Sequence, residues 1–383
     1  MAHPTLLFLI TEDYYFCSHR LPIARAAREA GFRVVVAARE QRHGETIRQE
    51  GFDFHPLRAL QRGFASPGGE AAALRELIGL YRRVRPDLVH HVAMKPVLYG
   101  SLAASLTGVP RVVNALAGMG YLFTASTLKA RLLRPPVRLA FRLLLGRPGR
   151  RVIVQNPDDL RLFVDNVGLP PERMALIRGS GVDAARFTPS PEPPTEATPD
   201  GPRITALFVG RMLWDKGVGE IVEAARRLRE RRVPVRLRLA GTPDPINPQS
   251  IPEATLRQWH DEGLVEWIGH HDDVAPLWRQ AHVALLPSYR EGLPKSLLEA
   301  AACGRPLLST DTTGCREIAR HDKTGLLVPV GDGLALADAL ERLAKDGELR
   351  RRLGANARHA VERAFAQEIV VNQTLELYRE LLG

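Results

Sequence analysis

The sequence is short of cysteines and of long apolar runs. Its 383 residues include only three cysteines, Cys17, Cys303 and Cys315, with no CxxC or Cys/His spacing suited to a metal. Neither a disulfide framework nor a zinc site is expected, and free thiols favour a reducing compartment such as the cytoplasm. The longest uncharged stretch, residues 112–128, contains two glycines and is too short for a transmembrane helix. The first apolar run, residues 6–10, lacks a basic n-region and a cleavage site, which predicts a β-strand rather than a signal peptide.

Positive charge is unevenly distributed along the chain. Residues 1–180 hold 26 Lys and Arg against 14 Asp and Glu, a net charge of +12, whereas the remaining residues hold 27 against 29. A basic first half predicts an anionic partner there. Nucleic acid is not expected, because the basic residues are not interleaved with aromatic ones and no nucleic-acid-binding module is recognisable. An anionic membrane surface is the remaining candidate.

One segment of the first half has no acidic residue at all. Between residues 128 and 151, basic residues are mixed with leucine, valine and phenylalanine. A basic amphipathic helix of this kind, interrupted by Pro135 and Pro136, suits an anionic lipid surface, where each basic residue contributes about 1 kcal/mol. The alternative is a surface helix whose apolar side packs on its own domain. The residues expected to face the membrane are Lys129, Arg131, Arg134, Arg138, Arg142 and Arg147.

Apolar strands alternate with amphipathic helical stretches along the whole chain, which predicts an α/β fold with parallel sheets. A proline-rich segment without apolar periodicity, residues 189–199, separates two sets of strands and is predicted to be a linker. Two Rossmann-like, doubly wound domains facing a cleft are therefore expected, at residues 1–185 and 200–365. The predicted strands are residues 6–10, 34–38, 88–92, 111–116 and 151–156, then 204–210, 235–241, 265–269, 283–288, 306–310 and 325–328.

Two cations follow the first strand of the second domain. Arg211 and Lys216 lie in the loop between strand 204–210 and the next helix. Ligands of open α/β sheets bind in the crevice at such strand ends. A helix N-terminus with two cations suits a diphosphate. Because lysine and arginine are common in these loops, a plain surface role is the alternative.

Two glutamates eight residues apart follow a later strand of the same domain. Glu291 lies in the loop after strand 283–288, where a carboxylate can bind sugar hydroxyls or oppose positive charge on a sugar carbon. Glu299 is the only acid in an apolar helix and needs polar partners if it is buried. Ribose hydroxyls would supply those partners, and a local cap or ion pair is the alternative. The residues expected to approach phosphate oxygens between the glutamates are Gly292, Leu293 and Pro294.

Several of these segments together resemble the retaining glycosyltransferases of GT-B fold known as family 4. The resemblance rests on GRMLWDKG at residues 210–217, on the spacing of Glu291 and Glu299, and on TGLLVP at residues 324–329. The preceding GSGVDAARFTP, residues 179–189, is similar to the interdomain segment of that family. The elements occur in the order and spacing of the family.

The resemblance implies a role for each residue of the second domain. It implies that Arg211 and Lys216 bind the donor diphosphate, that Glu291 contacts the donor sugar, and that Glu299 binds the ribose. It also implies retention of anomeric configuration with no metal or other cofactor. In that chemistry a departing phosphate oxygen takes the acceptor proton while the cations stabilise the leaving group. The family further implies that the final helix, residues 366–383, crosses back to the first domain.

A narrower resemblance comes from the first half of the chain. TEDYYFCSHRLPIARAA at residues 11–27, HHVAMKPVLYG at 90–100 and NALAGMGYLF at 114–123 are similar to bacterial transferases that extend undecaprenyl-diphosphate-linked sugars. That group includes N-acetylgalactosaminyltransferases and serves capsule, O-antigen and glycan assembly. The likeness implies a UDP-linked hexose or N-acetylhexosamine donor, a lipid-linked acceptor, and a peripheral position on the inner face of the cytoplasmic membrane. The alternatives are a transferase with a soluble acceptor, a nucleotide-sugar 2-epimerase, and an inactive scaffold.

The first domain lacks the glycine-rich first loop of the commoner family pattern. Polar residues follow its first strand instead and are expected to face the ligand crevice. A histidine or arginine there is expected to grip the acceptor phosphate, and an acid to bind the accepting hydroxyl. A helix-start role is the alternative for the histidine, and a plain turn is the alternative for the glycines. The acceptor-site candidates are Glu12, Asp13, His19, Arg20, Lys95, Gly118 and Gly120, whereas His90 and His91 are expected to be core residues.

Overall fold

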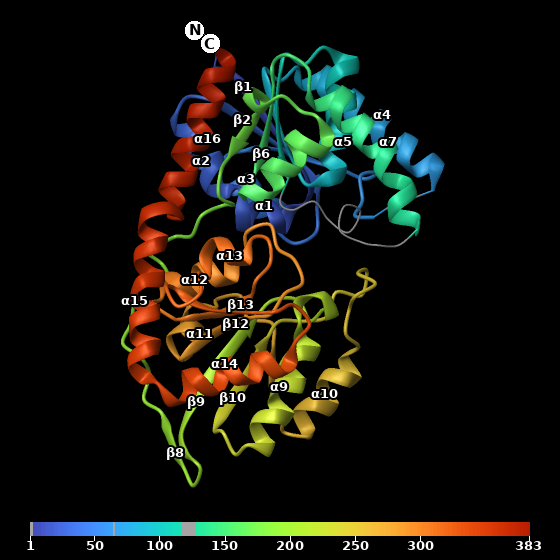
Figure 1. Cartoon of the computed structure of the whole chain (residues 1–383). Coiled ribbons are helices and arrows are strands. Elements are labelled where there is room, and N and C mark those ends of the chain that lie inside the picture. Colours follow the sequence, from blue (N-terminus) through green and yellow to red (C-terminus); the bar gives the residue numbers. More distant parts are fainter. Residues whose placement is uncertain (1–2, 64–65, 117–127) are drawn as a thin grey trace. The chain divides into compact units, whose positions relative to one another are not determined.

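The chain divides into two units, each built around a parallel β-sheet. The computed structural model describes residues 3–63, 66–116 and 128–383, with the backbone alone at residues 128–131 and 133. Unit 1 consists of Met1–Ser180 together with Glu368–Gly383, and unit 2 of Gly181–Gln367. Figure 1 shows the two units in the colours of the sequence. Each unit is described by itself below.

Unit 1 contains a seven-stranded sheet in which all neighbouring strands are parallel. Its strands are β1 (Thr5–Glu12), β2 (Arg33–Arg39), β3 (Asp53–Pro56), β4 (Leu88–Val92), β5 (Arg111–Leu116), β6 (Arg150–Val154) and β7 (Met174–Leu176). Their order is β3-β2-β1-β4-β5-β6-β7. The strand order reverses between β1 and β4, which is the switch point where such sheets bind ligands. Both strands are buried along their whole length, as parallel strands covered on two faces should be.

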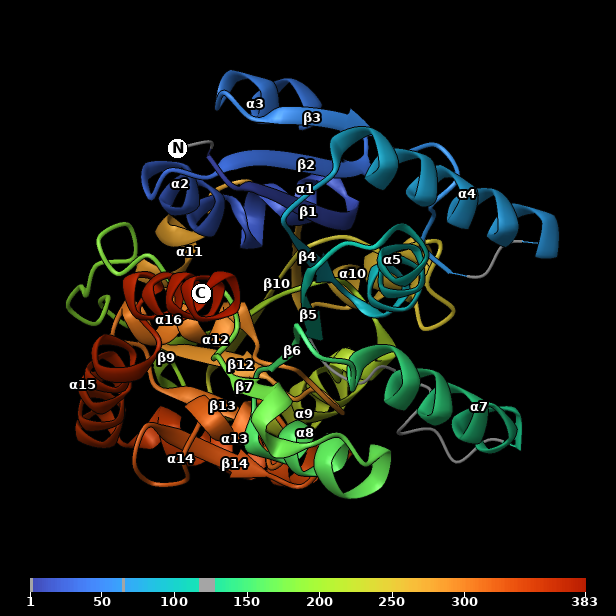
Figure 2. The ribbon, with the colours of Figure 1, turned by 90° about the horizontal axis from the view of Figure 1, so that it is seen from above.

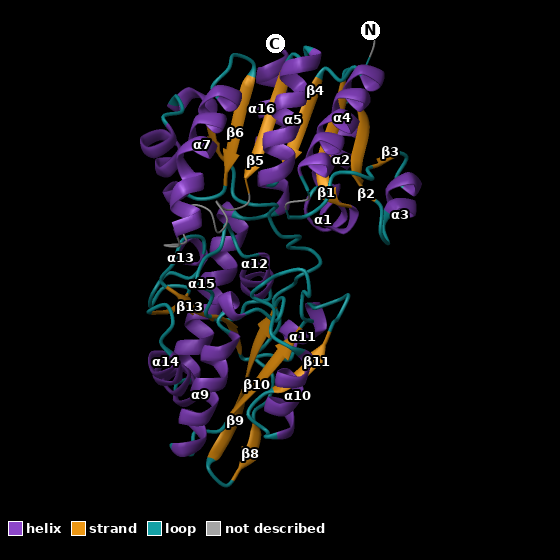
Figure 3. Cartoon of the chain, turned by 90° about the vertical axis from the view of Figure 1, so that its right-hand side faces the viewer, coloured by secondary structure: helices purple, strands orange, loops and turns teal. Residues whose placement is uncertain are grey.

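Helices cover both faces of this sheet (Figure 3). They are α1 (Asp13–His19), α2 (Leu21–Glu29), α3 (Gly44–Gln49), α4 (Pro67–Val84), α5 (Met94–Thr107), α7 (Leu128–Leu145), α8 (Pro157–Arg161) and α16 (Gln367–Leu382). Alternate residues of β4 mark the two faces, because side chains of a strand point to opposite sides. The His90 ring hydrogen-bonds to Tyr378 of α16, and the His91 ring hydrogen-bonds to Tyr81 of α4 at 2.8 Å. Both histidines are buried, so their prediction as core residues is confirmed.

The last helix of the chain belongs to unit 1, although it follows unit 2 in the sequence. Val370, Leu375 and Tyr378 of α16 are buried in the same apolar cluster as Phe8 of β1 and Ile23 of α2. The helix ends at the sheet, where the side chain of Arg111 donates to the backbone oxygen of Leu381. In Figure 2 the helix is the red one marked C. The core on this face of unit 1 is therefore completed by residues from the end of the chain.

Unit 2 repeats the same strand order. Its strands are β8 (Glu196–Thr198), β9 (Gly201–Val209), β10 (Val235–Ala240), β11 (Glu266–Gly269), β12 (Val283–Leu286), β13 (Leu307–Thr310) and β14 (Gly325–Val328). The parallel part runs β11-β10-β9-β12-β13-β14, and β8 adds to β9 antiparallel. Its helices are α9 (Val218–Glu230), α10 (Glu253–Asp261), α11 (Ala275–Arg279), α12 (Lys295–Ala302), α13 (Cys315–Ile318), α14 (Gly333–Lys345) and α15 (Gly347–Ala364). The switch point of this sheet lies between β9 and β12.

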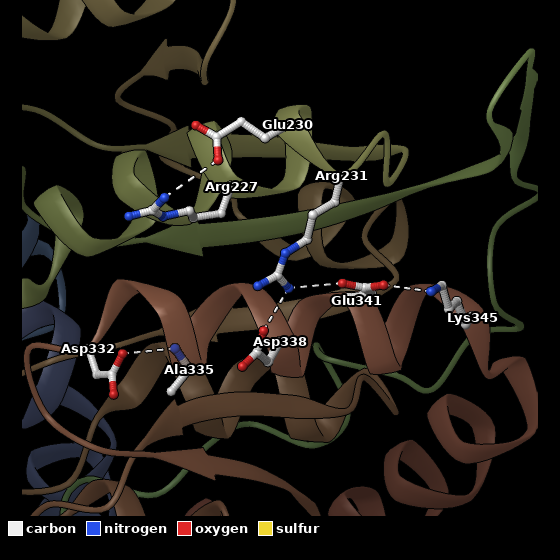
Figure 4. Close-up of polar contacts among 8 residues, drawn as sticks. All are labelled: Arg227, Glu230, Arg231, Asp332, Ala335, Asp338, Glu341 and Lys345. Carbon is white, nitrogen blue, oxygen red and sulfur yellow. Dashed lines mark hydrogen bonds and ion pairs between the residues drawn. The ribbon is translucent and has the colours of Figure 1, made fainter.

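Helices α9 and α14 pack side by side and carry ion pairs on their exposed surface (Figure 4). Arg231, just after α9, contacts Asp338 at 2.6 Å and Glu341 at 3.0 Å on α14. Lys345 also contacts Glu341, at 2.5 Å. Asp332 begins α14 by accepting a hydrogen bond from a backbone N–H of the first turn. Exposed pairs of this kind contribute about 0–1 kcal/mol each, so the buried contacts of the helices dominate their packing.

The proline-rich segment predicted to be a linker packs on unit 2. Arg305, which is buried, donates to the backbone oxygens of Ser190 at 2.8 Å and Pro191 at 3.1 Å. Glu192 of the same segment forms an ion pair with Arg350 of α15. The division between the units falls at Ser180–Gly181, so the boundary lies before the prolines rather than within them.

Candidate active site

The two predicted cations of unit 2 follow β9 at the carboxyl edge of the sheet. Arg211 lies two residues beyond the strand, and Lys216 ends a 3₁₀ turn, Trp214–Lys216, that leads into α9. Gly217 makes this turn possible, because it has φ of 75° and a Cβ there would lie 2.1 Å from the backbone oxygen of Pro287. The turn is thus pressed against the end of β12. Only glycine allows both the positive φ and this close approach.

The two predicted glutamates come from β12 and the helix that follows it. The loop after β12 is tied to the Lys216 turn, since the backbone N–H of Tyr289 donates to the Asp215 oxygen at 2.9 Å. Glu291 follows in this loop, and its backbone N–H donates to Thr313 at 3.2 Å. Glu299 lies inside α12 and is 8% exposed. Strand ends of β9 and β12 therefore carry cations and acids to one place, the switch point of the sheet.

One cavity of about 260 Å³ brings these side chains together. Arg211, Lys216, Glu291 and Glu299 all line it, as the sequence predicts for a common site. Pro294 also lines the cavity. It immediately precedes α12 and is not the first residue of that helix. Gly292 and Leu293 are not among the lining residues, and the Leu293 side chain packs against the core of unit 2. The lining residues are Val209, Gly210, Arg211, Lys216, Leu286, Glu291, Pro294, Lys295, Ser296 and Glu299.

Two lining residues, Lys295 and Ser296, were not singled out from the sequence. Both lie in the first turn of α12, and the Lys295 ammonium is 3.7 Å from the Glu299 carboxylate. The signal available in the sequence was the i, i+4 spacing of a lysine and a glutamate on one helix. With Lys295 the cavity holds three cations against the two glutamates, an excess of one positive charge. Such a charge balance favours an anionic ligand.

The charged side chains of the cavity are paired with one another or with neighbouring acids. The Lys216 ammonium contacts the Glu291 carboxylate, and both side chains are less than 20% exposed. Arg211 contacts Asp244 at 2.7 Å, from a side chain that is about half exposed. Burial raises the pKa of Glu299, while the nearby Lys295 lowers it. Burial also raises the pKa of Asp215 beside Lys216. A ligand with oxygen acceptors would therefore take the place of the acids that now contact the cations.

The first-domain acids after β1 hold a neighbouring loop in place. Asp13 is fully buried, and its carboxylate accepts hydrogen bonds at 2.7–2.8 Å from the backbone N–H groups of Tyr14, Gln41 and His43. Glu12 is also buried and accepts from the Gln41 side chain at 2.7 Å, and burial raises its pKa. Each oxygen of Asp13 thus accepts at least one backbone hydrogen bond, which gives the carboxylate a role in holding this loop. Contact of Glu12 or Asp13 with an acceptor hydroxyl stays a prediction.

The basic acceptor candidates have very different surroundings. His19 ends α1, stacks on Tyr15 with ring centroids 4.1 Å apart, and contacts Ser18. Lys95 is engaged by Glu70 at 3.0 Å and by a backbone oxygen at 2.8 Å, so it is not open to phosphate in this structure. Arg20, between α1 and α2, is 3% exposed and pairs with none of the acids that the structure describes. Its Nε atom is buried without a hydrogen-bond partner.

A buried guanidinium without a counter-charge is costly unless something satisfies it. Arg20 therefore remains the strongest of the described acceptor-phosphate candidates. It acts electrostatically on His90, whose pKa lies well below its usual value chiefly because the ring is buried. Gly118 and Gly120, the last two candidates, lie outside the described residues.

The basic segment forms helix α7, which runs through Pro135 and Pro136 instead of breaking there. Proline inside a helix cannot donate the backbone hydrogen bond, and its ring crowds the carbonyl four residues earlier, at a cost of about 3 kcal/mol or more. The side chains of Lys129 and Arg131 are outside the described part of the chain. Arg142 and Arg147 are exposed, and Arg134 and Arg138 are half-buried.

Helix α7 has apolar residues on two opposite sides. Phe141 and Leu145 are fully buried in a cluster with β6. The leucine stripe, Leu132, Leu139 and Leu143, is 57–69% exposed. At 100° per residue these three leucines fall within about 40° of one another, on the side opposite Phe141. Packing of the helix on its own domain explains the side with Phe141 and Leu145. It does not explain the leucine stripe, which remains uncovered within unit 1. No helix among the described residues is long and apolar enough to cross a membrane.

Comparisons with known proteins agree with this geometry. The glycosyl transferase 4-like family matches residues 5–154, and the glycosyl transferases group 1 family matches residues 203–346. The N,N'-diacetylbacillosaminyl-diphospho-undecaprenol alpha-1,3-N-acetylgalactosaminyltransferase of Campylobacter jejuni is 24% identical, over 96% of this chain and 96% of that protein. The putative colanic acid biosynthesis glycosyltransferase WcaL of Escherichia coli is 34% identical, over 57% of this chain and 54% of that protein.

A solved structure shares the fold over nearly the whole chain. HepE of Anabaena in complex with UDP-glucose has a TM-score of 0.77 at 18% identity, covering 99% of this chain and 100% of that one. Both halves of the sequence thus match glycosyltransferase families, and both sheets have the Rossmann-like strand order of the fold. The chain therefore belongs to the glycosyltransferases of GT-B fold, with a glycosyl transferase 4-like domain followed by a group 1 domain.

Proposed function

We propose that the protein is a retaining, metal-independent glycosyltransferase of surface polysaccharide or glycan assembly. It transfers a hexose or N-acetylhexosamine from a UDP-sugar to a saccharide carried on a polyprenyl diphosphate. It acts at the cytoplasmic face of the membrane, which it contacts peripherally. The observation that carries the proposal is the single cavity at the β9–β12 switch point that is lined by Arg211, Lys216, Glu291 and Glu299.

The donor assignment follows from the chemistry of that cavity. Lys216 and Arg211 supply charge-assisted donors for a diphosphate, and arginine can bind two oxygens at once. Glu299 is buried at the far side of the cavity, where a carboxylate can accept hydrogen bonds from the two hydroxyls of a ribose. Glu291, in the loop after β12, is left for the donor sugar. HepE, which shares the fold, has been solved with UDP-glucose, and this supports a UDP-sugar as the donor.

The proposed reaction keeps the configuration of the sugar carbon. The bond between that carbon and the diphosphate oxygen breaks, and the acceptor oxygen forms its bond on the same face. The acceptor proton passes to an oxygen of the departing diphosphate. Lys216 and Arg211 stabilise the negative charge that develops there, and Glu291 opposes the positive charge that develops on the sugar. Preorganised charges of this kind usually supply the largest part of the rate enhancement.

The acceptor and membrane assignments are supported by unit 1 and by one relative. The Campylobacter relative, matched over almost its whole length, is named as acting on a diphospho-undecaprenol-linked sugar. Helix α7 presents the leucine stripe together with the exposed Arg142, and the exposed Arg147 follows two residues after the helix ends. Exposed leucines beside arginines suit the boundary between anionic headgroups and acyl chains. Arg20, buried and without an acidic partner in the described residues, is assigned to the acceptor phosphate.

The proposal is tested by nucleotide release from a panel of UDP- and GDP-sugars. Each sugar is offered with and without a diphospho-undecaprenol-linked monosaccharide in bilayers. We expect release only when one UDP-sugar and the lipid-linked acceptor are both present, with the α-linkage of the donor retained in the product by NMR. Release with a soluble saccharide alone would favour a soluble acceptor. Donor conversion without any acceptor would favour an epimerase, and either result would overturn the proposal.

Membrane contact is tested separately, by sedimentation with vesicles that contain anionic lipid. Replacing Arg138, Arg142 and Arg147 with glutamine should weaken vesicle binding about 100-fold, since each basic residue near the surface contributes about 1 kcal/mol. Glutamine keeps the helix propensity of α7. The control replaces the three arginines of residues 82–85, near the end of α4, and should bind as the wild type does. Equal losses in the two triple variants would show that total charge, rather than α7, attracts the membrane.

A further inference from the structure

One face of the sheet in unit 2 is unusually polar at its amino end. Arg203 and Thr205 alternate along β9, and Arg236 and Arg238 alternate along β10. Arg236 lies directly across from Thr205 in the register, so all four side chains share one face. Parallel strands covered by helices on both sides are normally apolar on both sides. Three arginines here indicate a face that is built to meet something other than an apolar helix.

A cavity of about 170 Å³ lies over this face. The short antiparallel strand β8 borders it through Glu196, which contacts Arg203 at 3.0 Å and Arg236 at 2.6 Å. Arg238 lies 3.3 Å from Glu266 of β11, which is not among the lining residues. Three arginines thus line the cavity, and two glutamates pair with them, which leaves an excess of one positive charge. The lining residues are Pro194, Glu196, Arg203, Thr205, Arg236, Arg238, Gln280 and His282.

His282 lies between this cavity and a second one, which is lined by Glu192, Arg305 and Arg350. The ring is 3% exposed, and its Nδ1 accepts a hydrogen bond of 3.0 Å from the backbone N–H of Thr205. Because Nδ1 is the acceptor, the proton of the neutral ring is on Nε2. Burial lowers the pKa of His282, which keeps the ring neutral at pH 7. Nε2 itself is buried and has no hydrogen-bond partner among the described residues.

The donor on Nε2 is not satisfied by the protein around it. Glu192 and the Pro193 carbonyl raise the pKa of His282 against the effect of burial, but among the described residues no acceptor meets the geometry of a hydrogen bond to Nε2. The Nε of Arg203, which lines the same cavity, is likewise buried without a partner. Leaving a buried donor unpaired costs about 1–3 kcal/mol. Both donors belong to residues that line one positively charged cavity. A ligand that carries only hydrogen-bond acceptors would suit this cavity.

We propose that this cavity binds the phosphate group of a small phosphorylated molecule. A phosphate offers acceptor oxygens in several directions, which matches donors from His282, Arg203 and Arg238. Glu196 already supplies a carboxylate to Arg203 and Arg236, so the carboxylate and the ligand share one set of arginines. The ligand competes with Glu196 for them.

The proposed phosphate site is separate from the donor cavity, the cavity at the β9–β12 switch point that is lined by Arg211, Lys216, Glu291 and Glu299. Arg203 lies near the amino end of β9, and Val209, which lines the donor cavity, lies at its carboxyl end. Thr205, the other β9 residue of the phosphate site, lies four residues from Val209, about 13 Å at 3.3 Å per residue. A donor diphosphate bound at the β9–β12 switch point does not span this distance. Strand β12 separates the two cavities in the same way, since His282 precedes it and Leu286 ends it.

The experiment is a calorimetric titration of the full chain with inorganic phosphate at constant ionic strength. We expect one phosphate per chain at this site. Replacing Arg203 with glutamine, or His282 with asparagine, should weaken binding at least tenfold, and asparagine can still accept from the Thr205 N–H. The matched control is Arg227→Gln, an exposed arginine of α9 whose partner is Glu230, seen in Figure 4. Its affinity should equal that of the wild type.

A variant that is expected to bind phosphate more tightly excludes misfolding as the cause of the changes in affinity. Glu196→Gln removes the competing carboxylate and should tighten phosphate binding about fivefold or more, which a damaged fold cannot do. No phosphate binding by the wild type, or an unchanged affinity in Glu196→Gln and Arg203→Gln, would overturn the proposal. Binding that is lost in Lys216→Ala but kept in Arg203→Gln would place the phosphate in the donor cavity and would overturn it as well.

Discussion

Replacing Lys216 with alanine separates a role in donor binding from a role in holding Glu291. The ammonium contacts the Glu291 carboxylate in the structure, so the lysine could serve either purpose. Both side chains are less than 20% exposed, and removing one partner of a buried pair costs up to about 3–5 kcal/mol of the free energy of unfolding. Loss of one preorganised donor to a developing anion raises the activation free energy by about 2.7–4 kcal/mol. We therefore expect turnover to fall about 10²- to 10³-fold, measured at a temperature where the variant is shown to be folded.

The affinity for UDP distinguishes the two roles without any acceptor. Lys216→Ala removes a charge-assisted hydrogen bond to the diphosphate, worth about 1.5–3 kcal/mol, and should weaken UDP binding about 10- to 100-fold by calorimetry. Glu291→Ala leaves the lysine free for the diphosphate and should bind UDP as tightly as the wild type or more tightly. Its turnover should still fall by orders of magnitude, because the donor sugar loses its carboxylate.

The control for this pair is Lys345→Ala, which removes a lysine from an exposed Lys–Glu contact on α14. It should change neither UDP affinity nor turnover. If Lys216→Ala and Glu291→Ala both leave UDP affinity unchanged, the lysine does not meet the diphosphate. In that case the reasoning from the donor cavity is refuted.

Three further predictions concern the same cavity. Burial raises the pKa of Glu299, and the carboxylate accepts from ribose hydroxyls only when it is ionised, so UDP-sugar affinity should fall as pH drops through this raised pKa. Calorimetry from pH 8 to pH 5 should show that fall in the wild type, and Glu299→Gln should bind weakly with no such dependence. Lys295 lowers the pKa of Glu299, so Lys295→Met should move the fall to higher pH, and an unmoved profile would exclude this coupling. Gly217→Ala should lower the free energy of unfolding by about 1–3 kcal/mol in urea, through strain at positive φ and its clash with a backbone oxygen. Gly108 has the same φ of 75° in open space, so Gly108→Ala should cost less, and equal costs would mean that the clash is relieved.

The long apolar strands of both sheets could be predicted from the sequence, because burial on two faces leaves continuous apolar runs. Their positions agree with the predictions within a few residues at each end. The strands that were missed have three or four residues each: β3 and β7 at the two edges of the unit 1 sheet, and β8, which pairs with the start of β9. A short edge strand carries too few apolar residues for a periodic signal. The linker was misplaced because proline content marks irregular backbone, and irregular backbone can still be held down by arginines such as Arg305.

The cavity proposed to bind the donor could be predicted in outline, because its residues lie in short loops after strands that are recognisable in the sequence. The acceptor-site candidates stay predictions, because partners from distant segments decide the surroundings of each side chain. Asp13 is occupied by backbone N–H groups almost thirty residues away, and Lys95 by Glu70. Short stretches of sequence do not predict such long-range pairings. Arg20 is a candidate because it is buried and no acid pairs with it among the described residues, and this too is visible only in the folded chain.

The position of α16 sets an order for the synthesis of the protein. A ribosome makes β1 to β7 before unit 2, but the apolar cluster on one face of that sheet lacks Val370, Leu375 and Tyr378 until α16 is translated. Unit 2 is made without interruption and has all its strands before then. Domains usually fold as units while the chain emerges. Unit 1 is thus begun before unit 2 but completed after it, and the nascent chain carries an open apolar face on unit 1 until α16 docks.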